Sequence, residues 1–479
     1  MKSDAGQPLQ VVMLPWLEPD HILPFIHLSN SLDANGVKVT FLCPPCLVSN
    51  IRTNLHANIP IANYTLPPDV ADFPAGGTEM TKMNSAAGLR LIEAVDASRQ
   101  QIEAALLLLS PQVVVFDFIY HWLPSSADSF GIKSVYFSVG TANSAASSMF
   151  LARYLPSTNL GLAMLRRVPS GFLAAISGLK GYEVHNAMNY LKRDRNARLS
   201  IYERVLTTMD RSSAIALNSS SEIEGTYINF FLAQCRKPVL LAGSLMGKPT
   251  ADELETRWEK WLSRHPKGSV VFCSFGNEAC LSEDQITELI AGFEMTGLSF
   301  LAILSFPPGT GKTREAIVGE RAGGRGLVHD GVVQQQQQRL MLRHSSVGVH
   351  VGHGESGLMM EAVASGCQVV LLPVKGDQFF NARLMADGLN AGVAVKRRSK
   401  DGRFSKEAVS EAVRMVVSDG TLAARKVRAN NAKVRQLLLN QSIQDCYIRR
   451  FVADLQELVA SPRSGDDENG YLPSTHEVL

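Results

Sequence analysis

The segment from residue 347 to residue 378 constrains the fold of this chain more than any other. It reads VGVHVGHGESGLMMEAVASGCQVVLLPVKGDQ: an apolar strand, a Gly-rich turn, a helix, a second apolar strand and an Asp-Gln pair. Two parallel strands need a crossover of this kind. The turn directs backbone N–H groups and the positive end of the helix dipole at one place, where an anion can bind. A histidine before the turn and a carboxylate one helical turn later suit a phosphate and a sugar diol, so the segment suggests a nucleotide-sugar site.

The length of 479 residues predicts two domains of about 200 residues each, because a single core stops growing before that size. The net charge of +2 gives no electrostatic reason to expect nucleic acid or an anionic membrane as a partner. No apolar run is long enough to span a bilayer, and the N-terminus lacks the apolar stretch of a secretion signal. We therefore expect a cytoplasmic protein without a membrane span, and its seven cysteines fit a reducing compartment.

Strand and helix patterns alternate in both halves of the chain, which predicts an α/β fold with parallel sheets covered on both faces. The first half predicts strands at 9–15, 37–43, 113–118 and 134–139 and helices at 22–32 and 123–130. After a Gly- and Pro-punctuated stretch near 243–250, the pattern restarts with strands at 269–275 and 299–305. The helix between them, 282–297, has a capping box in Ser282 and Gln285 and ends at Gly297.

His21 and Asp117 form a candidate acid–base pair. His21 follows the first strand in PWLEPDHILP, and Asp117 ends a later strand of the same domain in VVVFDFIYHWLP. The carboxyl ends of parallel strands meet at one edge of the sheet, where α/β active sites lie. A histidine there suits general-base work, and a carboxylate bonded to its far ring nitrogen would orient it. Helix capping is the competing interpretation of either residue alone.

Residues 306–313, FPPGTGKT, resemble the phosphate-binding loop of ATPases and follow a predicted strand. However, Phe306 stands where the motif requires glycine, a helix should follow Lys312 and Thr313, and we find no downstream apolar strand that ends in Asp-Glu to hold magnesium. A Gly/Pro-rich connection between strands is the simpler interpretation, and an ATPase stays as an alternative.

His344, His350 and His353 lie close together in the sequence, which raises the question of a zinc site. His350 and His353 would point to opposite faces of their strand, and no Cys or carboxylate completes a tetrahedral ligand set. We therefore expect no metal site.

Several segments in the right order resemble plant UDP-sugar-dependent glycosyltransferases of glycosyltransferase family 1. They are PWLEPDHILPFIHLSNSL, VVVFDFIYHWLP, WLSRHPKGSVVFCSFGNEACLSEDQITELIAGFEMTG and the box that ends at Gln378. The resemblance spans nearly the whole chain before its tail and is nearest to the branch that adds a sugar to an existing glycoside. It implies the GT-B architecture, two Rossmann-like doubly wound domains that face each other across a cleft.

This architecture divides the chain into five expected parts. They are an acceptor-binding domain at 1–243, a linker at 244–257, a UDP-sugar-binding domain at 258–440, a C-terminal helix at 441–460 that packs back on the first domain, and a disordered tail at 461–479.

The resemblance implies an inverting transfer with His21 as the catalytic base and Asp117 as its partner. His21 would take the proton of an acceptor hydroxyl while that oxygen attacks C1 of the sugar from the face opposite UDP. Positive helix ends and backbone N–H groups would stabilise the leaving diphosphate. No metal or other cofactor is expected beside the UDP-sugar co-substrate.

The resemblance also assigns contacts residue by residue. His353 matches the histidine that contacts the diphosphate, Glu361 the acid that holds the ribose hydroxyls, and Asp377 and Gln378 the pair that binds the donor sugar. Ser274 and Gly276 lie in the loop that approaches the phosphates. For the acceptor, the candidates are Trp16, Tyr120, Phe137 and Thr141.

Two departures from the family pattern concern the uracil and the phosphates. Ungapped counting puts Gln335 at the position of the uracil-stacking tryptophan and Gln338 at the Gln that bonds the uracil edge. If the Gln run is an insertion, Val332 replaces the tryptophan. Either way the aromatic platform is lost, and such stacking is worth about 1–3 kcal/mol.

The second departure replaces the family's Gly-Trp-Asn-Ser by residues 355–358, Glu-Ser-Gly-Leu. Glu355 puts a carboxylate beside the expected diphosphate, which is unfavourable unless it points away or pairs with a cation. The backbone amides of Ser356 and Gly357 can still bind phosphate. Asp20 stands before His21 where the family commonly has glycine, and it would raise the pKa of His21 if the side chains approach.

These patterns together predict an inverting UDP-sugar-dependent glycosyltransferase that adds a sugar to a hydroxyl of a plant secondary metabolite, such as an existing flavonoid or terpenoid glycoside. Glucose is favoured because Gln378 ends the box, while xylose, arabinose and rhamnose stay open. The alternatives are a weakly active or inactive GT-B protein that binds glycosides and, less favoured, the ATPase. A monomer is expected.

Overall fold

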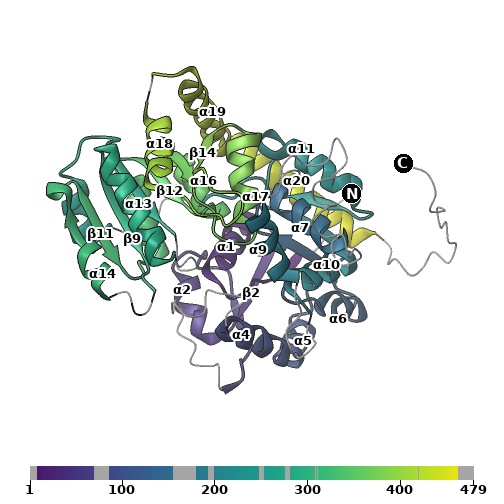
Figure 1. Ribbon diagram of the computed structural model, residues 1–479. Coiled ribbons are helices and arrows are strands. Elements are labelled where there is room, and N and C mark those ends of the chain that lie inside the picture. The colour runs from purple at the N-terminus through teal and green to yellow at the C-terminus, as the bar shows by residue number, and fades with distance from the viewer. Residues whose placement is uncertain are drawn as a thin grey trace.

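Two seven-stranded sheets, each covered by helices, organise the chain in the computed structural model (Figure 1). The structure describes residues 8–68, 86–154, 180–191, 199–247, 253–275, 281–307, 309, 311–418 and 420–461. The predicted tail therefore lies outside the described residues, except for Ser461.

The first sheet has the strand order β3-β2-β1-β4-β5-β6-β7, and all of its strand pairs are parallel. Its strands are β1 (Gln10–Leu14), β2 (Lys38–Cys43), β3 (Ile61–Asn63), β4 (Val113–Phe116), β5 (Lys133–Ser138), β6 (Ala214–Leu217) and β7 (Val239–Leu241). β4 and β6 are buried along their whole length. The four strands predicted in this half are confirmed to within two residues at each end.

The helices of this half are α1 (Pro19–Ala34), η1 (Pro45–Leu47), α2 (Val48–Arg52), α4 (Ala86–Ala97), α5 (Arg99–Leu109), α6 (Leu123–Ser129), α7 (Ala142–Tyr154), α9 (Gly181–Leu191), α10 (Ile201–Arg211) and α11 (Ser221–Gln234). The last described helix, α20 (Gln441–Ala460), returns to this half and buries Phe451 and Leu455 in the same core. No helix of the described ranges combines the length and apolar character needed to cross a membrane.

The second sheet has the order β10-β11-β9-β8-β12-β13-β14, with β10 antiparallel to β11 and the other pairs parallel. Its strands are β8 (Val270–Ser274), β9 (Ser299–Leu304), β10 (Gly319–Arg321), β11 (Gly326–Asp330), β12 (Val347–Gly352), β13 (Gln368–Leu371) and β14 (Gly392–Ala394). Its helices are α12 (Thr256–Leu262), α13 (Glu283–Thr296), α14 (Gly311–Ile317), η2 (Ala322–Gly324), α15 (Gln335–Arg343), α16 (Ser356–Ala364), α17 (Gln378–Arg383), the π-turn η3 (Leu384–Gly388), α18 (Lys406–Val417) and α19 (Leu422–Leu438).

The signals that predicted α13 are the ones that define its ends. The Ser282 side chain accepts the N–H of Gln285, and the Gln285 side chain accepts the N–H of Ser282, which forms the predicted capping box. Gly297 ends the helix with a φ of 76°, a left-handed conformation that glycine adopts without strain.

Each sheet has one place where the strand order reverses direction. In the first sheet this place lies between β1 and β4, and in the second between β8 and β12. Loops that leave two such strands diverge to opposite faces, so a crevice forms at their carboxyl ends, where ligands of α/β proteins bind. The predicted catalytic pair follows β1 and β4, while Ser274 and His353 stand at the ends of β8 and β12.

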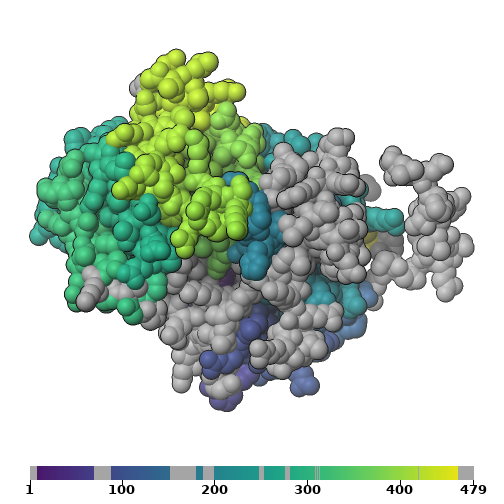
Figure 2. Space-filling model, in the orientation of Figure 1, coloured from purple at the N-terminus to yellow at the C-terminus, as the bar shows by residue number. Residues whose placement is uncertain are grey.

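Polar contacts join the two halves near these crevices. Thr141 Oγ1 donates to Asn381 Oδ1 at 2.7 Å, and Asn143 Nδ2 donates to the carbonyl oxygen of Phe380 at 2.7 Å. In Figure 2 the blue surface of α9 lies directly against the green surface of the second half, where Gly376 donates its N–H to Asn186 Oδ1 at 2.7 Å.

A glycine at the crossing of α13 and α18 gives a test of the second core. A Cβ added to Gly292 would lie 2.6 Å from Val409 Cβ and 2.9 Å from the carbonyl oxygen of Lys406. Gly292→Ala should therefore lower the free energy of unfolding by about 1–3 kcal/mol despite its better helix propensity. In the matched control Gly225→Ala, where a Cβ meets nothing within 4 Å, we expect a gain of about 0.5–1 kcal/mol. Urea midpoints that move equally in the two variants would contradict this packing.

Candidate active site

His21 and Asp117 form a hydrogen-bonded pair at the carboxyl edge of the first sheet. β1 and β4 pair in parallel with Leu14 opposite Phe116, so the residues that follow the two strands lie side by side. His21 Nδ1 lies 2.7 Å from Asp117 Oδ2, although 96 positions separate the two residues. Because an ionised carboxylate only accepts hydrogen bonds, Nδ1 donates and Nε2 is left as the basic nitrogen.

Two backbone amides fix the Asp117 carboxylate, which is 1% exposed. Its Oδ1 accepts the N–H of Phe118 at 2.8 Å, and its Oδ2 accepts the N–H of Trp16 at 3.3 Å. The carboxylate is therefore held from both sides before it meets the imidazole, which fixes the orientation of the ring.

The pKa of His21 follows from opposing effects. Burial lowers it, but the charge of Asp117 and the hydrogen bond to it, with smaller contributions from Glu18 and Asp20, raise it to about 9. The charge of Asp20 therefore contributes to the raised pKa of His21, which is the direction expected from the sequence. Below this pKa the ring is largely protonated, so the unprotonated form that can accept a proton becomes more abundant as the pH rises toward 9.

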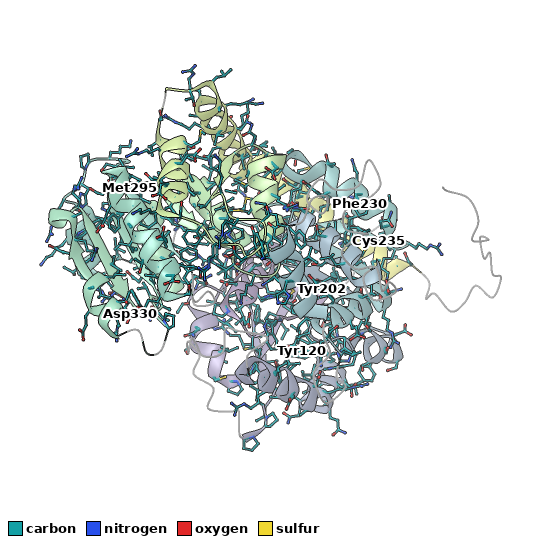
Figure 3. The ribbon with its side chains drawn as sticks, in the orientation of Figure 1. Tyr120, Tyr202, Phe230, Cys235, Met295 and Asp330 are labelled. Atoms are coloured by element: carbon teal, nitrogen blue, oxygen red, sulfur yellow. The ribbon has the colours of Figure 1, made fainter. Side chains whose placement is uncertain are left out.

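His21 faces a cavity that both halves of the chain line. The first half contributes Asp20, Asp117, Ser144 and Tyr202, among others, and the second contributes Glu355, Ser356, Lys375, Gly376, Asp377 and Gln378. Figure 3 places Tyr202 near the middle of the molecule. A second hollow shares Asp20, Glu355 and Ser356 with this cavity and continues to Arg339 and Glu361. The two hollows therefore adjoin, and they bring the predicted base together with most of the predicted donor residues.

The Asp-Gln pair that closes the box lines the cavity and is held by its own surroundings. Asp377 Oδ2 accepts from Asn381 Nδ2 at 3.1 Å and from Ser144 Oγ at 3.4 Å. Gln378 Oε1 accepts the N–H groups of two residues in the loop before it, both at 3.0 Å. The side chains that would meet a sugar are thus positioned beside His21.

Glu361 lies on α16 and lines the second hollow, which adjoins the cavity beside His21. Its Oε2 lies 2.8 Å from Arg339 Nε, and both side chains are about nine-tenths buried. Burial raises the pKa of Glu361, and the charges of Arg339 and Arg343 counter that effect only in part. The sequence interpretation named Glu361 but not Arg339, which reaches it from α15.

The family model of UDP-glucoronosyl and UDP-glucosyl transferases matches residues 202–427. UDP-glycosyltransferase 79A6 of Glycine max is 40% identical over 460 residues, which cover 94% of this chain and 97% of that protein. The chain belongs to the UDP-glycosyltransferase family. Anthocyanidin-3-O-glucoside rhamnosyltransferase of Petunia hybrida is 37% identical over 94% of this chain and 97% of that protein.

A solved structure with the same fold is Phytolacca americana UGT2 in complex with UDP-2fluoro-glucose and pterostilbene. It matches with a TM-score of 0.72 at 20% identity and covers 95% of this chain and 100% of that one. This likeness confirms the GT-B arrangement of two Rossmann-like sheets, and the family match confirms that the chain is a glycosyltransferase.

This UDP-glycosyltransferase has a hollow without an aromatic platform near Arg339. Phe, Tyr and Trp are absent from the described residues that line it. Gln335 lines the hollow, but its Nε2 donates to Asp20 Oδ1 across the two halves. Gln338 is buried instead, and its Nε2 donates to the carbonyl oxygen of Val333 at 2.8 Å. Both glutamine side chains are therefore engaged within the protein.

The N-terminus of α16 differs from the expectation that its amides are open. The Glu355 carboxylate folds back on the helix, with Oε1 accepting the N–H of Gly357 at 2.6 Å and Oε2 that of Leu358 at 2.8 Å. Burial and the nearby charges of Asp20 and Asp377 raise the pKa of Glu355 to about 8, although its two hydrogen bonds act against this. The sequence analysis expected the Glu355 carboxylate either to point away from the phosphate position or to pair with a cation. Neither occurs, since the carboxylate accepts hydrogen bonds from the two amides.

Two further candidate donor residues, Ser274 and His353, stand at strand ends. Ser274 ends β8 and is fully buried, and its hydroxyl has no hydrogen-bond partner within the described residues. His353 follows β12, is 3% exposed and lies with its ring centroid 6.3 Å from that of Phe275. Gly276 lies outside the described residues.

Three of the four acceptor candidates are packed in the core rather than along the described cavities. Trp16, Tyr120 and Phe137 are each 0% exposed. The Tyr120 hydroxyl donates to the carbonyl oxygen of Pro15 at 2.9 Å, and the Phe137 ring packs edge-on against another phenylalanine. Thr141 lines the hollow but bonds to the second half of the chain. α10 supplies side chains that do line the cavity beside His21, which the sequence interpretation missed: Ile201, Tyr202, Val205 and Met209.

The ATPase-like segment lies apart from this site. α14 does begin at Gly311, and the downstream strand β11 ends at Asp330, but Gly331 follows it, so this strand does not end in Asp-Glu. Asp330 pairs with Arg314 at 2.5 Å and accepts the N–H of Phe306 at 3.2 Å. Figure 3 shows Asp330 near the left edge of the view, in the second half of the chain and away from Tyr202. The glycosyltransferase match leaves the ATPase interpretation without support.

Asp117→Asn should change both the rate and its pH dependence. With the native carboxylate, kcat/KM should rise with pH up to about 9, the pKa of His21. In the variant, the pH at which kcat/KM stops rising should move toward 6.5, the usual pKa of histidine. The maximal kcat/KM should also fall at least about 100-fold, because the imidazolium is no longer stabilised. The surface pair of His56 and Asp33, 3.0 Å apart, provides the control Asp33→Asn, which should leave the profile unchanged. An unaltered profile in Asp117→Asn would mean that another group orients His21.

Proposed function

We propose that this UDP-glycosyltransferase moves a sugar from a UDP-sugar to a hydroxyl group of a plant secondary metabolite that already carries a sugar, with inversion at C1. One observation carries the chemical part of this proposal. The His21–Asp117 pair and the Asp377–Gln378 pair, which come from different halves of the chain, line the same cavity. A one-step displacement at C1 requires a base and sugar-binding side chains at the same cavity.

In this mechanism His21 Nε2 accepts the proton of the acceptor hydroxyl. The oxygen forms a bond to C1 as the bond between C1 and the phosphate oxygen breaks, and UDP leaves with that electron pair. Asp117 stabilises the imidazolium through Nδ1, which is the role of the carboxylate in other acid–base pairs. Asp377 and Gln378 hold the sugar hydroxyls, while Glu361 binds the ribose with Arg339 as its neighbour. His353 and Ser274 approach the diphosphate.

The acceptor class rests on the relatives. The Petunia hybrida relative is named for adding rhamnose to an anthocyanidin 3-O-glucoside, which is an existing glycoside. The cavity beside His21 supports a partly apolar acceptor, because Ile201, Val205 and Met209 line it together with Tyr202. Glucose is the proposed donor sugar on the basis of Gln378. A monomeric protein in the cytoplasm remains a prediction of the sequence.

Replacement of the base tests the mechanism directly. His21→Ala should reduce transfer by at least about 100-fold, because general-base catalysis contributes about 10²–10⁴, while UDP binding persists. The measurement is product mass for a panel of UDP-sugars with flavonoid and terpenoid glycosides, together with calorimetric titration by UDP. His56→Ala, on the surface, serves as the matched control. Full activity in His21→Ala would refute the assignment of His21 as the catalytic base. NMR of the product of the native enzyme should show an anomeric configuration opposite to that of the donor sugar.

A metal-free mechanism predicts the response to chelation. Because helix ends and backbone N–H groups are proposed to stabilise the leaving diphosphate, turnover in EDTA should stay within about twofold of the untreated rate. The test compares initial rates before and after chelation and after re-addition of Mg²⁺ or Mn²⁺. Activity that disappears with EDTA and returns with a divalent cation would overturn this part of the proposal.

A further inference from the structure

The N-terminus of α16 is capped differently from the other helices that the structure describes. Helices with a side-chain cap elsewhere in the described residues use Ser, Thr or Asn, whose oxygen accepts one N–H at 3.1–3.4 Å, as Ser282, Ser405 and Thr421 do. Glu355 instead accepts two N–H groups, at 2.6 and 2.8 Å, one with each carboxylate oxygen. The cap at α16 is thus a carboxyl group of the chain itself, which occupies two amides, one with each oxygen.

The position of this cap coincides with the expected phosphate position. α16 follows β12, one of the two strands at the reversal point of the second sheet, and phosphates bind at helix N-termini in such crevices. Glu355 lines both the cavity beside His21 and the hollow that reaches Glu361. The carboxylate therefore stands between the place proposed for the sugar and the place proposed for the ribose.

A second observation concerns the same crevice, between the carboxyl ends of β8 and β12. Ser274 ends β8, and its register partner on β12 is Gly352, just before the turn that leads to Glu355. The Ser274 side chain is fully buried, and its hydroxyl has no hydrogen-bond partner within the described residues. A buried hydroxyl without a partner is costly unless something else satisfies it. A phosphate oxygen held at this crevice would accept its hydrogen bond.

A phosphate and the Glu355 carboxylate cannot use the same amides together. Each N–H of Gly357 and Leu358 has one hydrogen to donate, and both are donated to Glu355. When ionised, the Glu355 carboxylate would also repel a phosphate, and Asp20 and Asp377 add negative charge around it. One of the two groups must therefore leave these amides for the other to bind.

We propose that Glu355 is an internal competitor of the donor diphosphate: its carboxylate holds the amides of Gly357 and Leu358 and has to rotate away before a nucleoside diphosphate can bind there. Glu355 thereby sets the affinity of the enzyme for its nucleotide donor. This inference rests on the proposed function, because it takes the N-terminus of α16 as the diphosphate site. The backbone of Glu355 is extended, with φ −60° and ψ 134°, so the residue caps the helix from outside its first turn.

The test is the affinity for UDP compared with that for uridine, which lacks the phosphates. Glu355→Gly removes the competing carboxyl group and leaves a residue that is well tolerated at helix N-caps. Its Kd for UDP should be lower by about tenfold or more, since hydrogen bonds to charged groups are worth about one to two factors of ten in binding. Glu355→Gln keeps the side-chain length without the charge and should show a smaller gain. The Kd for uridine should stay the same in both variants.

Glu407→Gln is the matched control, because Glu407 is an acid in the first turn of α18, in the same half of the chain, and lines neither of the two hollows. It should leave both affinities unchanged. Thermal unfolding of each variant in the absence of ligand identifies any that fail to fold, and the Gln variant retains a cap if the Gly variant does not fold.

The possible outcomes separate this inference from the proposed function. UDP affinity that is unchanged or weaker in Glu355→Gly overturns the competition, as does an equal gain for uridine. If those results come with normal sugar transfer by the native enzyme, only the role of Glu355 is refuted. If the native enzyme and both variants bind no UDP and transfer no sugar, the proposed function and the inference are refuted together.

Discussion

The parallel pairing of β1 with β4 is the constraint on which the active site depends. It sets Leu14 opposite Phe116, and the two side chains that follow these strands meet as a 2.7 Å hydrogen bond. The pairing of β8 with β12 sets Ser274 opposite Gly352, so Ser274 and His353 stand at the same edge of the second sheet. Because both pairs lie where the strand order reverses, two crevices form at carboxyl edges. The contacts between α7 and α17 then bring the crevices to one cavity.

Features that are encoded locally were predictable from the sequence. The capping box of Ser282 and Gln285 and the terminal Gly297 predict the ends of α13, because each signal acts within a few residues of the backbone that it bonds. The meeting of His21 and Asp117 was also predictable, although they are distant in sequence. It needs only that two apolar strands be parallel neighbours, after which their carboxyl ends share an edge.

Features that depend on the direction of a side chain were not predictable. Trp16 and Tyr120 follow β1 and β4, and Phe137 lies in β5, yet each side chain is buried in the core. The order of residues along a strand and its loop does not say which face a cavity will use. The contact of Gln335 with Asp20 joins residues 315 positions apart across two domains, and no local signal encodes it. Glu355 was recognised as a conflict with the diphosphate, but the fold-back onto its own helix was not, since glutamate is not a preferred helix cap.

Asp20 links the two halves of the site electrostatically. Its charge contributes to the raised pKa of His21 and also to the raised pKa of Glu355, and the side chain of Gln335 holds it from the second half. A diphosphate that replaced the Glu355 carboxyl group would bring further negative charge to the same region. Since negative charge nearby favours the imidazolium, this charge would add to that of Asp117, Glu18 and Asp20, which already raise the pKa of His21.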